Sequence, residues 1–148
     1  MKELRTILYA TDFSESSAAA CETACYLAEL AGAKVHVLHV LGELADQRKA
    51  RIPAEAFAIF EKEVEAQAIK EMATFCRDKF APPLEHTTEI VVGTPFEAIL
   101  DKAAQAGADL IVMGTHGRTG IEHVLLGSTA ERVVRRSTIA VLTVRSAP

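Results

Sequence analysis

The sequence has no surplus of positive charge. Its 148 residues include 16 lysines and arginines against 20 aspartates and glutamates, so the net charge is −4. A mainly electrostatic grip on nucleic acid or on an anionic membrane needs a basic face, so we expect neither as a partner. No apolar run approaches the length that spans a membrane. Because 49% of the residues are hydrophobic, we predict one folded domain over residues 1–148.

Cysteine is also scarce. The three cysteines are Cys21, Cys25 and Cys76, no CxxC pair occurs, and the N-terminus lacks the apolar segment of a signal peptide. We therefore predict reduced thiols in a cytoplasmic protein. Cys21 and Cys25 share one face of a predicted helix. A metal site or a redox pair is one interpretation of that spacing, but the pattern favours small core residues.

Two well-known phosphate-binding signatures are missing. A P-loop needs a lysine after its last glycine, and the glycine-rich segment here has none. The dinucleotide fingerprint needs glycines after the first strand, where this chain has residues 11–14, Thr-Asp-Phe-Ser. Neither signature can therefore explain a phosphate site in this protein.

The periodicity of the chain predicts alternating strands and helices. Predicted strands cover residues 4–10, 34–40, 87–92, 109–113 and 139–144, and predicted helices cover about 14–31, 53–80, 94–107 and 129–136. The polar segment 41–52 is predicted to be an irregular loop. Along the 53–80 helix, an apolar stripe from Phe57 to Phe75 is predicted to be core. The alternation predicts an open parallel sheet with helices on both faces.

A glycine-rich segment, residues 114–128, joins the fourth strand to the last helix. Gly114, Gly117, Gly127 and Ser128 give the spacing Gly-x2-Gly-x9-Gly-Ser. Backbone N–H groups and the dipole at a helix N-terminus favour an anion, typically phosphate. If the first and fourth strands are neighbours, Asp12 and Gly114 fall side by side in the crevice at the strand ends.

This spacing resembles the ATP-binding branch of the universal stress protein family. Further matching segments are residues 7–14, 93–95, 108–118 and 126–133. The resemblance implies a Rossmann-like, adenine nucleotide alpha hydrolase-like sheet in the order 3-2-1-4-5. It also implies a bound ATP, AMP or ADP, with Mg²⁺ or Mn²⁺ held through the phosphates and not by protein ligands alone. The implied cofactor-binding residues are Ala10, Thr11, Asp12 and Val40 at the base and sugar, and Gly114, Thr115, Gly117, Arg118, Gly127, Ser128 and Thr129 at the ribose and phosphates.

Several of these residues have a simpler interpretation. Ser128 heads a predicted capping box with Glu131, so its hydroxyl could cap its own helix. Asp12 or Ser14 could cap the first helix, Arg118 could be a surface residue, and Val40 could be core. His116 and His123 could contact phosphate or transfer a proton, whereas His36 and His39 are interpreted as hydrogen-bonded structural residues.

The last predicted strand, residues 139–144, carries neither charge nor proline. An edge strand of this kind is expected to pair, and its simplest partner is a second copy across a two-fold axis. The family resemblance also implies a homodimer through this strand. The family usually has a proline where the strand begins, and residues 137–140, Ser-Thr-Ile-Ala, replace it here.

The leading hypothesis is a dimeric, ATP-binding regulator of the stress response with no dedicated catalytic residue and an unidentified signalling partner. The alternative is a slow ATPase or a nucleotidyl-transfer enzyme that uses His116, Arg118 and Asp12. A third hypothesis is an interaction module whose glycine-rich segment binds a partner.

Overall fold

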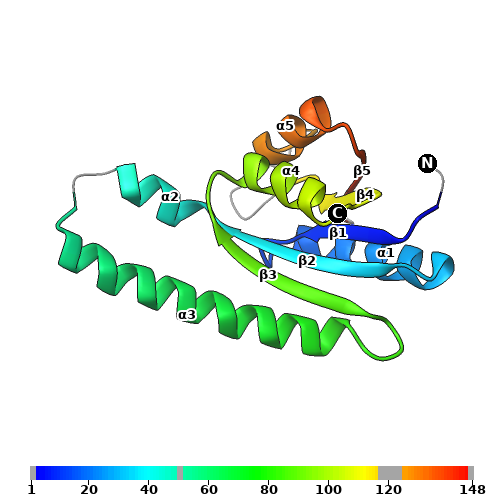
Figure 1. Cartoon of the computed structure of the whole chain (residues 1–148), viewed down its shortest axis with the longest axis horizontal. Coiled ribbons are helices and arrows are strands. Elements are labelled where there is room, and N and C mark those ends of the chain that lie inside the picture. Colours follow the sequence, from blue (N-terminus) through cyan, green and yellow to red (C-terminus); the bar gives the residue numbers. More distant parts are fainter. Residues whose placement is uncertain (1–2, 50–51, 117–124, 147–148) are drawn as a thin grey trace.

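The computed structural model describes residues 3–49, 52–116 and 125–146. Its strands form one parallel sheet in the order β3-β2-β1-β4-β5, which confirms the predicted fold (Figure 1). The strands are β1 (Thr6–Ala10), β2 (Lys34–Leu41), β3 (His86–Val92), β4 (Leu110–Gly114) and β5 (Ala140–Val144). β1 and β4 are therefore neighbours, with Ala10 opposite Met113, as the crevice hypothesis required.

Helices pack on both faces of this sheet. They are α1 (Glu15–Ala31), α2 (Gly42–Lys49), α3 (Ala54–Lys79), α4 (Pro95–Gln105) and α5 (Ser128–Arg136). Side chains of a strand alternate between the two faces, so Ile7 and Tyr9 join the core with α1 and α3. Leu8 and Ala10 join the core with α4 and α5. The central strand β1 is thus buried on both faces.

The first helix is capped as its sequence predicts. Ser14 is the N-cap and accepts a hydrogen bond from Ser17 N at 3.2 Å. The Asp12 carboxylate accepts from Ser14 N at 3.0 Å and so fixes the turn before the helix. Gly32 ends the helix in the left-handed conformation, at φ 68°. Residues 94–97, Thr-Pro-Phe-Glu, also predict a capping box at α4, but the side chain of Thr94, the N-cap there, makes no capping hydrogen bond, so this prediction is wrong.

The prediction of an irregular loop over residues 41–52 is also wrong for most of its length. Residues Gly42–Lys49 form helix α2. Its one large apolar side chain, Leu44, is fully buried against Leu41 and Ala68. A single leucine gives no periodic signal in a polar segment, so tertiary packing decides the conformation here.

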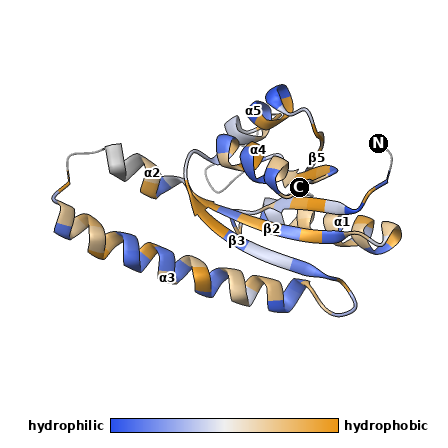
Figure 2. Cartoon of the chain, in the orientation of Figure 1, coloured by the Kyte–Doolittle hydropathy of each residue, from blue (hydrophilic) through white to orange (hydrophobic). Residues whose placement is uncertain are grey.

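The apolar stripe of α3 is only partly core. Ala68 and Met72 are buried, but Phe60 is 37% exposed. The N-terminal end of α3 extends beyond the ends of the strands (Figure 1), so the sheet covers only the later part of the helix. Figure 2 shows hydrophilic and hydrophobic residues mixed along the whole of α3, while β3 changes from hydrophilic at its start to hydrophobic at its end.

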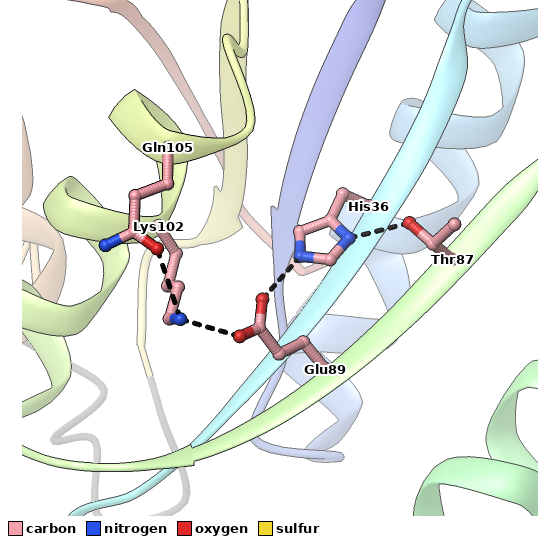
Figure 3. A network of polar contacts seen from close by, with 5 residues as sticks. All are labelled: His36, Thr87, Glu89, Lys102 and Gln105. Carbon is pink, nitrogen blue, oxygen red and sulfur yellow. Dashed lines mark hydrogen bonds and ion pairs between the residues drawn. The ribbon is translucent and has the colours of Figure 1, made fainter.

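A polar network ties β3 to its neighbours (Figure 3). The ring of His36 on β2 bonds Thr87 Oγ1 at 2.7 Å and Glu89 Oε1 at 2.9 Å. Lys102 of α4 approaches Glu89 Oε2 at 2.7 Å and donates to Gln105 Oε1 at 3.3 Å. The structural interpretation of His36 is confirmed.

The start of β5 shows how the chain manages without the usual family proline. Ser137 ends α5, and its hydroxyl donates to Ile139 O at 2.6 Å. The same oxygen accepts from Ile139 N at 3.0 Å. This local turn leads the chain into the parallel pairing of Leu110 with Ala140, so a serine fixes the geometry that a proline ring would otherwise restrict.

Candidate functional site

A cavity of about 560 Å³ opens at the carboxyl ends of the central strands; we call it the strand-end cavity. Nine of the predicted cofactor-binding residues line it: Ala10, Thr11, Asp12, Val40, Gly114, Thr115, Gly127, Ser128 and Thr129. The other two, Gly117 and Arg118, lie outside the described residues, as does His123. The fold therefore brings together segments that are about a hundred residues apart in the sequence.

A chain of buried hydroxyl groups supports one wall of this cavity. Tyr9 Oη donates to Ser17 O at 2.6 Å and lies 2.7 Å from Ser17 Oγ. Ser17 Oγ in turn donates to Thr11 Oγ1 at 2.6 Å. Burial raises the pKa of Tyr9 well above its usual value, so the phenol stays a neutral donor. Ser17 and Thr11 line the cavity, and this network holds both in place.

The turn after β1 has an unusual backbone. Phe13 adopts a left-handed conformation, with φ 64°, which is costly for a residue with a side chain. Its ring packs 4.3 Å from the ring of His39 and 5.6 Å from that of Phe75. His39 is buried, and its Nδ1 lies 2.8 Å from Thr11 O. These contacts stabilise the turn that presents Asp12 to the cavity and confirm the structural interpretation of His39.

Two glycines are required by the close approach of other chain segments. A Cβ on Gly114 would lie 2.9 Å from Ser16 Oγ and 3.0 Å from Ser16 O, so α1 packs directly on this backbone. A Cβ on Gly127 would lie 3.1 Å from Thr115 O, which also accepts from Gly127 N at 2.7 Å. An anion site was the predicted reason for these glycines, and close packing of the chain accounts for them as well.

Helix α5 points its N-terminus at the cavity. Its N-cap is Gly127, which has no side chain to cap the helix, and Ser128 is the first helical residue. The predicted capping box headed by Ser128 is therefore wrong, because extended Gly127, at ψ 164°, already supplies the cap geometry. Glu131 N makes the first intrahelical bond, to Gly127 O. The N–H groups of residues 128–130 precede it and remain suited to an anion.

Sequence reasoning missed much of the lining. The residues it did not assign are Ser17, Leu38, His39, Gly42, Glu43, Pro95, Ile99, Met113, His116, Leu126 and Ala130, with His116 considered only for proton transfer. Most follow or end a parallel strand, or begin the next helix, so they share one edge of the sheet. The Gly93-Thr94-Pro95 helix start after β3 was the available signal, because it predicts a helix N-terminus at that same edge.

The lining is divided by chemistry. Val40, Ile99, Met113 and Leu126 supply apolar surface, whereas the start of α5 supplies backbone donors and hydroxyls. Within residues 3–49, 52–116 and 125–146, no group of three or more His, Cys, Asp or Glu side chains converges to hold a metal ion. No helix in this part of the chain is long and apolar enough to cross a membrane. The cavity thus combines an apolar part with an end where backbone N–H groups and hydroxyls meet.

This sheet order, with a cavity at the strand ends, defines a Rossmann-like α/β protein. The model of the universal stress protein family matches residues 3–145, so the chain belongs to that family. Universal stress protein MJ0577 of Methanocaldococcus jannaschii is 31% identical, over 95% of this chain and 94% of its own length. Universal stress protein MJ0531 of the same organism is 32% identical, over 95% and 82% of the two lengths.

Solved structures agree. The structure of MJ0577 has a TM-score of 0.85 at 30% identity and covers 98% of both chains. UspA from Lactobacillus plantarum has a TM-score of 0.78 at 26% identity and covers 98% of this chain and all of its own. A universal stress protein solved in complex with cAMP has a TM-score of 0.63 at 26% identity, with 99% and 100% coverage. The predicted family and fold are confirmed.

Proposed function

We propose that this universal stress protein binds ATP in the strand-end cavity. The observation that carries the proposal is the meeting, in one cavity, of an apolar wall and the N-terminus of α5. An adenine ring needs apolar contact surface, and phosphates need N–H donors and hydroxyls. The relative in complex with cAMP supports an adenine nucleotide as the ligand class.

This division supports one orientation of the nucleotide. The base and ribose lie near Thr11, Asp12 and Val40, and the phosphates lie at Ser128 and Thr129. Asp12 is kept away from the phosphates, because one carboxylate oxygen holds Ser14 N and like charges repel. Mg²⁺ or Mn²⁺ would arrive with the phosphates, coordinated mainly by them and by water.

Titration calorimetry with ATP tests the proposal. Wild type is expected to bind with a stoichiometry of one, and Ser128→Asp is expected to lose binding because a carboxylate then faces the phosphates. An aspartate in the first turn also stabilises a helix, so the variant should remain folded. Thr138→Asp, an exposed hydroxyl-to-carboxylate change after the far end of α5, is the matched control. No heat with wild type, or equal binding by Ser128→Asp, would refute ATP binding.

Binding, and not rapid hydrolysis, is the proposed activity, with nucleotide occupancy as the signal in a cytoplasmic stress response.

The slow-ATPase alternative has one observation in its favour. His116 lines the cavity, and its Nδ1 lies 3.0 Å from Thr115 Oγ1. Multiple-turnover release of ADP that is lost in His116→Ala would establish the enzyme. Turnover unaffected by that change would exclude the histidine from the chemistry.

We also propose that two copies pair through β5 to form a homodimer. β5 is an edge strand, and its residues Ala140–Val144 carry no charge. Light scattering at micromolar protein concentration should give twice the mass of the 148-residue chain, and a monomer would contradict this part of the proposal.

A further inference from the structure

A second, smaller cavity lies between α1 and the C-terminal end of α3. Its volume is about 280 Å³, and it is lined by Cys21, Glu22, Cys25, Tyr26, Glu29 and Lys79; we call it the dithiol pocket. Among the described residues, the two cavities have no lining residue in common. A ligand here would therefore be independent of the proposed nucleotide site.

The two thiols of this pocket lie one helical turn apart. Cys21 and Cys25 are at positions i and i+4 of α1, which places both side chains on the same face. Cys21 is buried with the core, whereas Cys25 is half-buried and its thiol donates weakly to Lys79 O at 3.9 Å. Both cysteines line the same small pocket, so one small ion there can contact both side chains.

The charges around the thiols favour a cation over an anionic oxidant. The carboxylates of Glu22 and Glu29 line the pocket together with the ammonium group of Lys79, so the charged lining is net negative. A disulfide between the two cysteines is disfavoured by geometry. The Cβ atoms of an i,i+4 pair are about 5–6 Å apart, and a disulfide needs about 3.5–4.5 Å.

We propose that the dithiol pocket binds one soft monovalent metal cation, Cu(I), through the Sγ atoms of Cys21 and Cys25. Thiolates select Cu(I), which accepts as few as two of them. Zinc needs four ligands, and within the described ranges no group of three or more His, Cys, Asp or Glu side chains converges. Cys76 is nearby in the same core, but its thiol donates to Met72 Sδ at 3.7 Å.

Charge balance gives Lys79 a part in this site. Two thiols and one Cu⁺ form a bis-thiolate complex with a net charge of −1 and release two protons. No electron is transferred, so the step needs no oxidant. The ammonium group of Lys79, at the pocket, offsets the negative charge of the complex. The half-buried position of Cys25 provides the route by which the cation enters.

The experiment is an anaerobic titration of the reduced full-length chain with Cu(I), in competition with the coloured chelator bicinchoninate. Wild type is expected to remove one equivalent of Cu(I) and to develop the ultraviolet absorption of a Cu(I)–thiolate bond. Cys25→Ser and Cys21→Ala should each lose this uptake, whereas Cys76→Ala should keep it. Circular dichroism checks that Cys25→Ser, the less buried change, remains folded.

Two results would overturn the proposal. One is equal uptake by wild type and folded Cys25→Ser, and the other is loss of uptake in Cys76→Ala to the same degree as in Cys25→Ser. Trapping of a sulfenic acid at Cys25 with dimedone after peroxide treatment, without Cu(I) uptake, would instead assign a redox thiol and sink the metal site.

Lys79→Gln separates the charge effect from the thiol ligands. The variant should still take up one equivalent, with an affinity about two- to fivefold weaker, as expected for one partly solvated charge. Lys62→Gln, on an exposed part of α3 far along the sequence from the pocket, is the matched control and should bind as wild type. A stronger affinity in Lys79→Gln would contradict the charge balance.

Discussion

The two edges of the sheet are built differently. The β3 edge is covered at its apolar end, where Ile90 and Val92 pack with the cluster of Leu41, Leu44 and Ala68 from β2, α2 and α3. Its polar part is tied down by the His36–Glu89–Lys102 network (Figure 3). The β5 strand is the last in the sheet order at the other edge, and none of its residues Ala140–Val144 is charged.

This difference indicates which edge is protected and which is available. Proteins block edge strands with charges, bulges or covering segments, because an open edge pairs with other chains. β3 uses a covering helix pair and an ionic network, so self-association there is not expected. The residues Ala140–Val144 of β5 include no charge and no proline, which is why the homodimer is proposed at this edge.

The largest expected effect follows from uncovering the β3 edge. Leu44 is fully buried between α2 and the sheet, so Leu44→Ala should lower the free energy of unfolding by about 2–5 kcal/mol. Leu30→Ala is the matched control, because Leu30 is 72% exposed and should change stability by less than about 0.5 kcal/mol. Urea denaturation of the two variants checks this, and equal midpoints would show that α2 does not depend on Leu44.

The next effect concerns pairing at the β5 edge. The backbone C=O of Val144 accepts from Thr115 N, so the backbone groups of Val144 point toward β4. Backbone groups of successive residues in a strand point to opposite sides, so those of Thr143 point away from the sheet. Thr143→Pro removes an outward N–H without breaking the β4–β5 pairing. Across a two-fold axis two hydrogen bonds are lost, each worth about 0.5–1.5 kcal/mol. The dimer should therefore weaken about tenfold or more, as measured by sedimentation.

Thr88→Pro gives the matched change at the other edge. Val35 N donates to Glu85 O, so the backbone groups of Glu85 point toward β2. Thr88 comes three residues later, so its backbone N–H points away from the sheet. This variant should leave the oligomeric state unchanged. If Thr88→Pro dissociated the dimer and Thr143→Pro did not, the assignment of the two edges would have to be reversed.

The smallest effect is the acid sensitivity of the β3 network. The hydrogen bond from Lys102, and to a lesser extent that from His36, lowers the pKa of Glu89 below its usual value of 4.5. A carboxyl whose pKa is lower in the folded state adds stability above the unfolded value, and this contribution is lost as the pH falls through the folded value. Because the pair is partly exposed, the contribution is below about 1 kcal/mol.

Melting temperatures measured between neutral and acidic pH test this contribution. Glu89→Gln should be less stable than wild type above pH 4.5, and the gap should close in more acidic solution. Glu85→Gln, at the exposed start of the β3 segment, is the control and should keep a constant gap. A gap that stays constant for Glu89→Gln would mean that the network does not depend on the charge.

The fold could be predicted because its signals are repetitive. Buried strands such as Thr6–Ala10 and Leu110–Gly114 alternate with helices that begin at caps such as Ser14. Helix α2 could not be predicted, because one buried leucine in a polar segment carries no period. The exposure of Phe60 was missed for a related reason: a stripe shows which face of a helix is apolar, but not how far the sheet extends beneath it.

The site was predicted in part. The family resemblance predicted a binding role for Thr11, Asp12, Ser128 and Thr129, and the structure brings these four residues into one cavity. The prediction that the Ser128 hydroxyl caps its own helix was wrong, because only the backbone conformation shows that Gly127 takes the N-cap position. Residues such as Glu43 and Ile99 depend on which elements meet at the strand ends, and this follows from the three-dimensional arrangement alone.

The hydroxyl chain beneath the cavity has a spectroscopic consequence. The protein has two tyrosines and no tryptophan, so no indole absorbs the energy of an excited phenol. Tyr26 is 65% exposed, whereas Tyr9 is bonded to Ser17, which lines the strand-end cavity. In a Tyr26→Phe variant all tyrosine emission comes from Tyr9. The molecule thereby contains its own fluorescent reporter of whatever occupies that cavity.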